Sequence, residues 1–391
     1  MKRTGAKAAQ AVNGITLTFC LSLLSCAGGR GEKYDYQGKV AENPTVSYAK
    51  GFEIVNRNYY SQIIIKNPWQ GAEGVTMTWY LVPYDYSPPE GTDPSSVIRV
   101  PVKKIVCMST THVAMVSVLG ETESLVGISG TNFIYEQQVR GKIENGTIME
   151  IGFEDNLNKE RLIILEPDIV MAYGVGSESS AYAGKLTELG IKTLFNADYL
   201  ETHPLGKAEW IKLFGALYCK ENAADSIFRN IEKEYNDLKS FIRFNAKDPP
   251  DVLMGLPFRD AWFISPGNSY VSILISDAGG KYLWRDIESS VSMPYGIEDV
   301  YLRALKADYW LNIGSVGSKQ EIISIDTRLA DLPCFKNGNL YNNNQRLSVG
   351  GGNDYWESGT LNPHIILKDI ASLLHAELFH DHKLVYYKRI E

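Results

Sequence analysis

A ten-residue phrase occurs twice in this chain of 391 residues, and its second copy begins 140 residues after the first. The copies read LEPDIVMAYG at 165–174 and LKADYWLNIG at 305–314. Each has the pattern of a helix end, an acidic break, an apolar run typical of a strand buried on both faces, and a glycine. The repeat predicts two similar α/β lobes. In such folds ligands bind in the crevice at the carboxyl ends of the strands.

Strands alternate with helices on both sides of one long segment without glycine or proline. The strands expected before that segment are 104–108, 125–129, 169–173 and 191–195, with helices at 158–165, 179–189 and 208–218. The elements expected after it are 252–256, 270–277, 297–304, 309–313, 322–332 and 363–374. This alternation indicates parallel sheets. The segment itself, with apolar residues at helical spacing, predicts one bridging helix of roughly 35 Å that ends at Pro249 and Pro250.

The N-terminus has the pattern of a lipoprotein signal. Basic residues precede the apolar run 15–24, which closes on Leu23-Leu24-Ser25-Cys26. We interpret 1–25 as a signal peptide and 26–33 as a tether whose Cys26 is lipidated. The mature chain is then exported and anchored on the periplasmic side of the cell envelope, at an inner or outer membrane. The alternative is an ordinary signal peptide with a chance cysteine.

Residues 34–98 differ from the rest of the chain. Three β-branched and aromatic runs, 51–56, 59–66 and 75–82, predict a small antiparallel sheet. A proline-rich linker follows, and the sequence assigns the extension no role. The expected order is therefore a β-rich extension and linker at 34–98, an α/β lobe at 99–220, a bridging helix at 221–248, and a second α/β lobe at 249–391.

The composition excludes several functions. A net charge of −7 argues against nucleic acid as a partner, and a hydrophobic fraction of 44% suffices for two cores. Cys107, Cys219 and Cys334 lack C-x-x-C spacing, which argues against structural zinc and leaves one disulfide among the three open. Hydrolase, metalloprotease and P-loop motifs are absent, and the glycines at 350–352 follow no strand-to-helix pattern. We therefore expect a binding protein without a cofactor, not an enzyme.

Aromatic residues point to the kind of ligand. The chain has 23 Tyr and 7 Trp, and many fall in loops rich in glycine, asparagine or proline. Rings on loops commonly supply flat stacking surfaces with a polar group at one end. This distribution favours a large, flat or ring-bearing ligand.

A series of short motifs carries a family resemblance over residues 102–378. In the first half these are KIV at 104–106, STTH at 109–112, LVGIS at 125–129, LEPDIV at 165–170 and LGI at 189–191. In the second half they are GG at 279–280, EDVY at 298–301, ADYWLN at 307–312, NDYWE at 353–357 and the run 367–379. In this order the motifs resemble those of ABC-importer substrate-binding proteins that carry cobalamin, ferric siderophores or haem. The resemblance implies two Rossmann-like lobes joined by one rigid helix, and a monomer that delivers its ligand to a permease.

The resemblance also implies which residues act. The ligand-binding candidates on loops after strands are Thr111, His112, Phe133, Tyr135, Tyr173, Trp262, Phe263, Tyr270, Tyr295, Tyr355 and Trp356. For each aromatic residue the alternative is packing, and for His112 it is a hydrogen bond within a helix turn. Glu178 and Glu298 are candidates for docking on arginines of the permease. The alternative is that both are solvated surface charges without a partner protein.

Two other functions stay open at this point. One is a zinc- or manganese-binding protein of similar shape, which needs three or four His, Asp or Glu ligands that converge in the cleft. His112 is the only clear candidate for such a ligand in the sequence. A surface scavenger lipoprotein without a permease needs the cleft but neither Glu178 nor Glu298. Few basic residues fall near the cleft, Arg259 and Arg346 being the nearest, which disfavours a strongly anionic catecholate complex.

Overall fold

The structure is a computed structural model that describes residues 46–153, 156–175 and 178–391, without the side chains of 178–182. All described residues belong to one compact unit. The predicted signal peptide, at 1–25, and the predicted tether, which begins at Cys26, lie outside the described residues. Within the described part of the chain, no helix is both long and apolar enough to cross a bilayer.

The first lobe is built on a five-stranded sheet of order β7-β6-β5-β8-β9, and all its pairings are parallel. Its strands are β5 (Ile105–Cys107), β6 (Leu125–Ile128), β7 (Met149–Glu150), β8 (Ile169–Ala172) and β9 (Thr193–Phe195). Its helices are α1 (Thr110–Val118), α2 (Gln137–Glu144), α3 (Lys159–Leu165) and α4 (Glu178–Glu188). β5, β8 and β9 are buried along their whole length, as expected for strands covered on both faces.

The second lobe repeats this plan with the order β13-β10-β15-β16-β17. Its strands are β10 (Asp251–Met254), β13 (Lys281–Tyr282), β15 (Tyr309–Leu311), β16 (Leu340–Asn342) and the antiparallel edge strand β17 (Lys388–Arg389). Its helices are α8 (Tyr270–Asp277), α9 (Ile297–Ala304), α10 (Lys319–Ile325), α11 (Pro333–Lys336) and α12 (Pro363–Leu374). The predicted fold class, mixed α/β with parallel sheets in two lobes, is confirmed.

The repeated phrase has the same structural role in both lobes. Asp168 precedes β8, and its carboxylate accepts the backbone N–H groups of Lys103 and Lys104 at 2.7 and 2.9 Å, just before β5. Asp308 precedes β15, and its carboxylate accepts the N–H of Asp251 at 2.8 Å, where β10 begins. In each lobe the acidic residue therefore ties together the amino ends of two neighbouring parallel strands.

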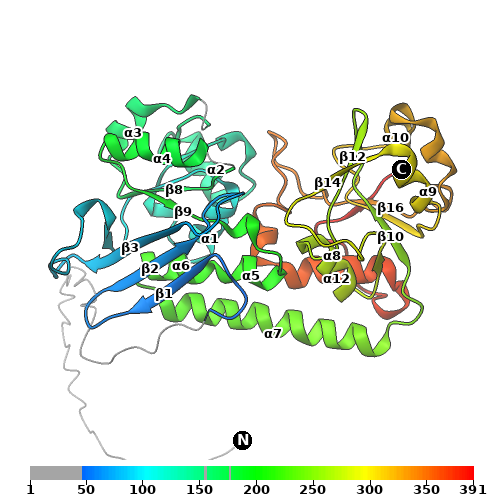
Figure 1. Cartoon of the computed structure of the whole chain (residues 1–391), viewed down its shortest axis with the longest axis horizontal. Helices are drawn as coiled ribbons and strands as arrows, with labels where there is room; N and C mark the ends of the chain where they lie inside the picture. The colour runs from blue at the N-terminus through cyan, green and yellow to red at the C-terminus, as the bar shows by residue number, and fades with distance from the viewer. Residues whose placement is uncertain (1–45, 154–155, 176–177) are drawn as a thin grey trace, which may run out of the picture. The chain divides into compact units, whose positions relative to one another are not determined.

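One helix, α7 (Glu221–Asn245), runs from the first lobe to the second (Figure 1). Its buried face carries Ala224, Phe228, Ile231, Tyr235 and Ile242. It contacts α6 and α5 of the first lobe and α12 and α8 of the second. The stretch 208–218, expected to be one helix, is instead split between α5 (Pro204–Glu209) and α6 (Ile211–Leu217). The break falls at Trp210, whose indole N–H donates to Glu201.

A second, smaller sheet in the second lobe was not predicted. It is antiparallel and consists of β11 (Pro257–Phe258), β12 (Ala261–Ile264) and β14 (Met293–Gly296). A left-handed residue, Arg259, makes the turn between β11 and β12. Short 3-10 turns complete the chain at Pro94–Ser96, Thr122–Ser124, Thr131–Phe133, Asp198–Leu200, Thr327–Asp331, Ser358–Leu361 and Ala376–Leu378.

The N-terminal extension forms a four-stranded sheet of order β1-β2-β3-β4. β1 (Phe52–Asn56), β2 (Ser61–Lys66) and β3 (Thr76–Pro83) are antiparallel, and β4 (Val97–Val100) pairs with β3 in parallel. β4 begins directly after the proline-rich linker and crosses the boundary expected between the extension, which was to end at 98, and the first lobe, which was to begin at 99. Alternate residues of β1 and β2 are buried and join the main core of the molecule. The three cysteines Cys107, Cys219 and Cys334 are free thiols.

Candidate functional site

The two lobes touch where a loop of the second lobe passes the 3-10 turn after β6. Ser348 Oγ donates to the carbonyl of Asn132 at 3.0 Å. A Cβ atom on Gly350 or Gly352 would collide with the carbonyl oxygen of Asn132 or Phe133. The glycines at 350–352 therefore allow backbone to lie against backbone across the lobe boundary. We call the contact between 131–136 and 346–357 the lobe seam.

A buried carboxylate closes the lobe seam. Glu357, only 2% exposed, accepts the N–H of Tyr135 at 2.7 Å and the N–H of Glu136 at 2.8 Å. These donors lie at the amino end of α2, where the helix dipole favours negative charge. Burial nevertheless raises the pKa of Glu357 to about 7, and the two N–H groups only partly oppose that rise. The closing contact thus depends on a carboxyl group that titrates near neutral pH.

Arg346 organises the second-lobe side of the seam. Its Nε lies 3.0 Å from Oδ2 of the buried Asp354, and its guanidinium lies 4.8 Å from the centre of the Tyr135 ring. Asp354 also accepts the hydroxyl of Ser358 at 2.7 Å. Arg346 is therefore held by a carboxylate of its own lobe while it covers an aromatic ring of the other.

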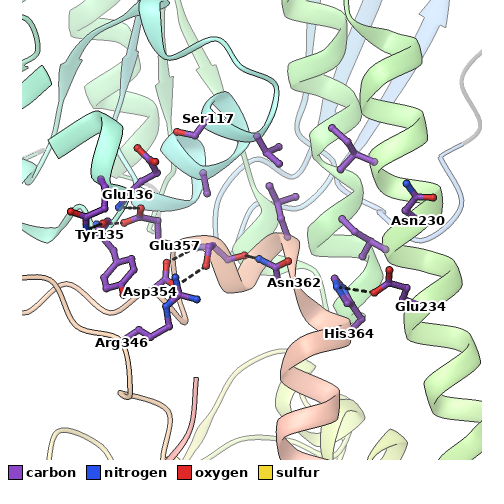
Figure 2. A pocket seen from close by; sticks show the side chains of 17 residues that line it. Ser117, Tyr135, Glu136, Asn230, Glu234, Arg346, Asp354, Glu357, Asn362 and His364 are labelled. Atoms are coloured by element: carbon purple, nitrogen blue, oxygen red, sulfur yellow. Dashed lines mark hydrogen bonds and ion pairs between the residues drawn. The ribbon is translucent and has the colours of Figure 1, made fainter. Parts of the chain in front are cut away.

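A cavity of about 580 Å³ lies beside the lobe seam. Figure 2 shows Tyr135, Arg346 and Glu357 at one end of it, and at the other the contact of 3.3 Å between His364 Nε2 and the carboxylate of Glu234 of α7. The walls come from α1, the start of α2, α7 and the segment 354–364. Its volume is within the range of small-molecule sites in proteins.

The first-lobe candidates from the sequence fall into two groups. Phe133 is 44% exposed on the 3-10 turn after β6, Tyr135 lines the cavity, and Tyr173 is half-buried directly after β8. Thr111 is half-buried in the first turn of α1. His112 is completely buried, and burial lowers its pKa to about 3, so it stays neutral. Its ring is not available to a ligand in this structure.

The second-lobe candidates divide in the same way. Phe263 and Trp356 are 52% and 49% exposed. Trp262 and Tyr355 are core residues: the indole of Trp262 donates to the carbonyl of Met254, and Tyr355 is 2% exposed. Tyr295 is half-buried on β14. The half-buried ring of Tyr270, at the start of α8, has the ammonium of Lys207 4.8 Å from its centre, so α5 and α8 meet there.

The docking candidates lie at helix starts. Glu298 is exposed in the first turn of α9, and its carboxylate pairs with Arg328 at 3.3 Å. Its own backbone N–H and that guanidinium lower its pKa. Glu178 begins α4, but its side chain is outside the described residues. Over those same residues, no group of three or more His, Cys, Asp or Glu side chains is placed to hold a metal ion.

Sequence reasoning missed the residues that join the lobes. Glu357 ends the NDYWE motif, and the glycines at 350–352 were read only as a loop. The available signal was three successive glycines followed closely by two acidic residues. Pairing that loop with residues 131–136 required a contact between positions more than 200 apart in the chain, which local patterns do not encode.

Glu357 is expected to make stability depend on pH. Its pKa is raised from 4.5 to about 7 in the folded protein, so folding takes up a proton between these values. The native state therefore gains stability from Glu357 as pH falls from about 8 to about 5. Urea unfolding of the wild type and of Glu357→Gln at both pH values should show that the wild type gains stability relative to the variant as pH falls, because the other titrating groups, such as His112, are common to both proteins. Parallel pH dependences in the two proteins would contradict it.

Comparison with known proteins agrees with this architecture. Residues 105–346 match the family described as periplasmic binding protein. The chain is 27% identical to an uncharacterized lipoprotein of Methanocaldococcus jannaschii, over 74% of this chain and 69% of the relative. It is similar in structure to a possible iron-binding periplasmic solute-binding protein from Staphylococcus epidermidis, with a TM-score of 0.56, 16% identity and coverage of 70% and 99%. A periplasmic heme-binding protein from Pseudomonas aeruginosa gives a TM-score of 0.55, 15% identity and coverage of 74% and 98%. At these identities the two structures establish the fold.

Proposed function

The chain belongs to the periplasmic binding protein family, and on that basis we propose that it captures a ferric siderophore, haem or cobalamin between its lobes and passes it to an ABC-importer permease. Members of this family bind substrates and are not enzymes. The structures from S. epidermidis and P. aeruginosa are named for iron and heme binding, which supports this choice of ligand class.

One observation carries the proposal. Exposed aromatic rings stand on segments of both lobes that touch at the lobe seam: Phe133 on the first-lobe side and Trp356 on the second-lobe side. Aromatic rings that stay partly exposed on both sides of one contact offer flat surfaces on which a ring-bearing ligand can stack. We propose Phe133, Tyr135, Tyr173, Phe263 and Trp356 as the ligand-contacting residues. Because the lobes share one continuous helix, only a small hinge motion is expected on binding.

Trp356→Ala is expected to weaken binding by about tenfold, because it removes a stacking surface worth about 1 to 1.5 kcal/mol. The purified protein is titrated separately with haemin, cyanocobalamin and ferrioxamine B, and quenching of tryptophan fluorescence is followed. Phe244→Ala is the matched control, since Phe244 is an 88% exposed ring near the end of α7. Submicromolar binding of one probe, weakened by Trp356→Ala and not by Phe244→Ala, is the expected result. Equal affinities in the wild type, Trp356→Ala and Phe244→Ala would show that Trp356 does not contact the ligand.

The remaining parts of the proposal concern location and partners. A lipid on Cys26 would anchor the protein in the cell envelope, and the relative from M. jannaschii is likewise named a lipoprotein. Glu178 and Glu298 are proposed to dock on the permease. Each lies in the first turn of a helix, Glu178 in the first lobe and Glu298 in the second, so each lobe would offer one acidic side chain to the permease.

A further inference from the structure

The N-terminal sheet is attached rigidly to the first lobe. The buried carboxylate of Glu201 accepts the N–H groups of Lys50 and Gly51 at 2.8 and 2.9 Å, immediately before β1. The ring of Phe52, at the start of β1, packs 4.6 Å from that of Trp210. These contacts fix the sheet to α5 and the turn that precedes it. The sheet therefore moves with the first lobe.

The loop 67–75 between β2 and β3 is itself ordered by backbone hydrogen bonds. Asn67 N donates to the carbonyl of Val75 at 2.8 Å, and Val75 N donates to the Asn67 side chain at 3.2 Å. Inside this closure, Ala72 N donates to the carbonyl of Trp69 at 3.0 Å. That turn requires a positive φ at Gly71, which has 82°. The loop is thus a preorganised turn that presents Trp69.

This loop lies at the carboxyl ends of β8 and β9. The Trp69 ring meets Phe195, the last residue of β9, edge-on with 5.6 Å between ring centres. Gln70 N donates to the hydroxyl of Tyr199 at 3.0 Å, and that hydroxyl donates to the carbonyl of Gly174. Gly174 follows Tyr173, one of the proposed ligand contacts. Tyr199 therefore joins the 67–75 loop to the loop that carries Tyr173.

We propose that the 67–75 loop is an additional ligand-contacting loop of the first lobe, in which Trp69 stacks on a flat tetrapyrrole or corrin ring. Trp69 is only half-buried, so part of its ring stays accessible at the strand ends where such folds bind ligands. The family match begins at residue 105, so the loop lies outside the matched region. This inference rests on the proposed function and narrows its ligand class to planar rings.

The test compares planar and non-planar probes. Trp69→Ala is expected to weaken binding of haemin or cyanocobalamin by about fivefold to tenfold, while Trp69→Phe retains most of the affinity. Any weak binding of ferrioxamine B, which has no ring to stack, should change less than twofold. Tyr84→Ala is the control, because it removes an exposed ring at the opposite end of β3. Thermal unfolding of each variant separates a loss of binding from a loss of folding.

A second variant tests the link between the loops. Tyr199→Phe keeps the ring and removes the hydroxyl that connects Gln70 to Gly174, so amide exchange at Gln70 should rise and planar-probe affinity should fall about threefold. If the wild type binds a planar probe and Trp69→Ala binds it equally well, the inference fails while the proposed function stands. If the wild type binds none of the three probes, both fail.

Discussion

Glu209→Ala is expected to lower the free energy of unfolding by about 4 kcal/mol, the largest effect that we predict for a single substitution. Glu209 is fully buried in α5 and accepts the N–H groups of Ser47, Tyr48 and Ala49 at 2.9, 2.7 and 2.9 Å. It also pairs with the buried ammonium of Lys212 at 2.9 Å. Alanine would leave three backbone donors without their acceptor and a buried cation without its nearest carboxylate.

Urea unfolding at constant pH measures this effect, and hydrogen exchange at 47–49 locates it. Glu232→Ala is the matched control. Glu232 of α7 accepts a hydrogen bond from the Tyr48 hydroxyl at 2.8 Å, and its replacement by alanine should lower the free energy of unfolding by less than about 1 kcal/mol. Glu209→Gln, which keeps one oxygen, should fall between the two. Equal losses for Glu209→Ala and Glu232→Ala would mean that the segment before β1 is not anchored by Glu209.

Glu357→Ala is expected to loosen the lobe seam without unfolding either lobe. The change removes the common acceptor of the Tyr135 and Glu136 N–H groups, and each buried donor left unsatisfied costs about 1 to 3 kcal/mol. Amide exchange at Tyr135 and Glu136 should therefore accelerate by about 30-fold, which corresponds to about 2 kcal/mol. The lobe cores, which keep their own contacts, should exchange as in the wild type.

Ser348→Ala is the control for the seam. It removes one half-buried hydroxyl from the same contact, which donates to the carbonyl of Asn132 and accepts the N–H of Gly352, and its effect on exchange at Tyr135 and Glu136 should stay within about threefold. Small-angle X-ray scattering of Glu357→Ala should show a larger radius of gyration if the lobes part. Unchanged exchange at Tyr135 and Glu136 would mean that the seam is not closed in solution.

The parts of the fold that were predictable from sequence are those with strong local periodicity. The repeated phrase indicated two similar lobes because Asp168 and Asp308 each perform the same local task, accepting N–H groups from a neighbouring strand. α7 was predictable because its 25 residues contain no helix breaker and bury one face. Both features depend on residues close in sequence or on one repeated pattern.

The rest depends on contacts that no local pattern encodes. Trp262 and Phe263 are neighbours on β12, so one points into the core and the other into solvent, whereas a loop assignment treated them alike. Tyr355 is buried because Tyr386 and Tyr387 arrive from the end of the chain and pack their rings about 6 Å from its own. Aromatic composition alone does not distinguish a ring that packs in a core from a ring that is accessible to a ligand.

The central claim, that a ligand binds between the lobes, is tested most directly by hydrogen–deuterium exchange of the wild-type protein with and without saturating haemin, cyanocobalamin or ferrioxamine B. The account predicts that one of these probes protects segments of both lobes together, at 131–135 and 173–175 in the first and at 346–357 in the second. Protection confined to one lobe, or protection by none of the probes, would contradict it.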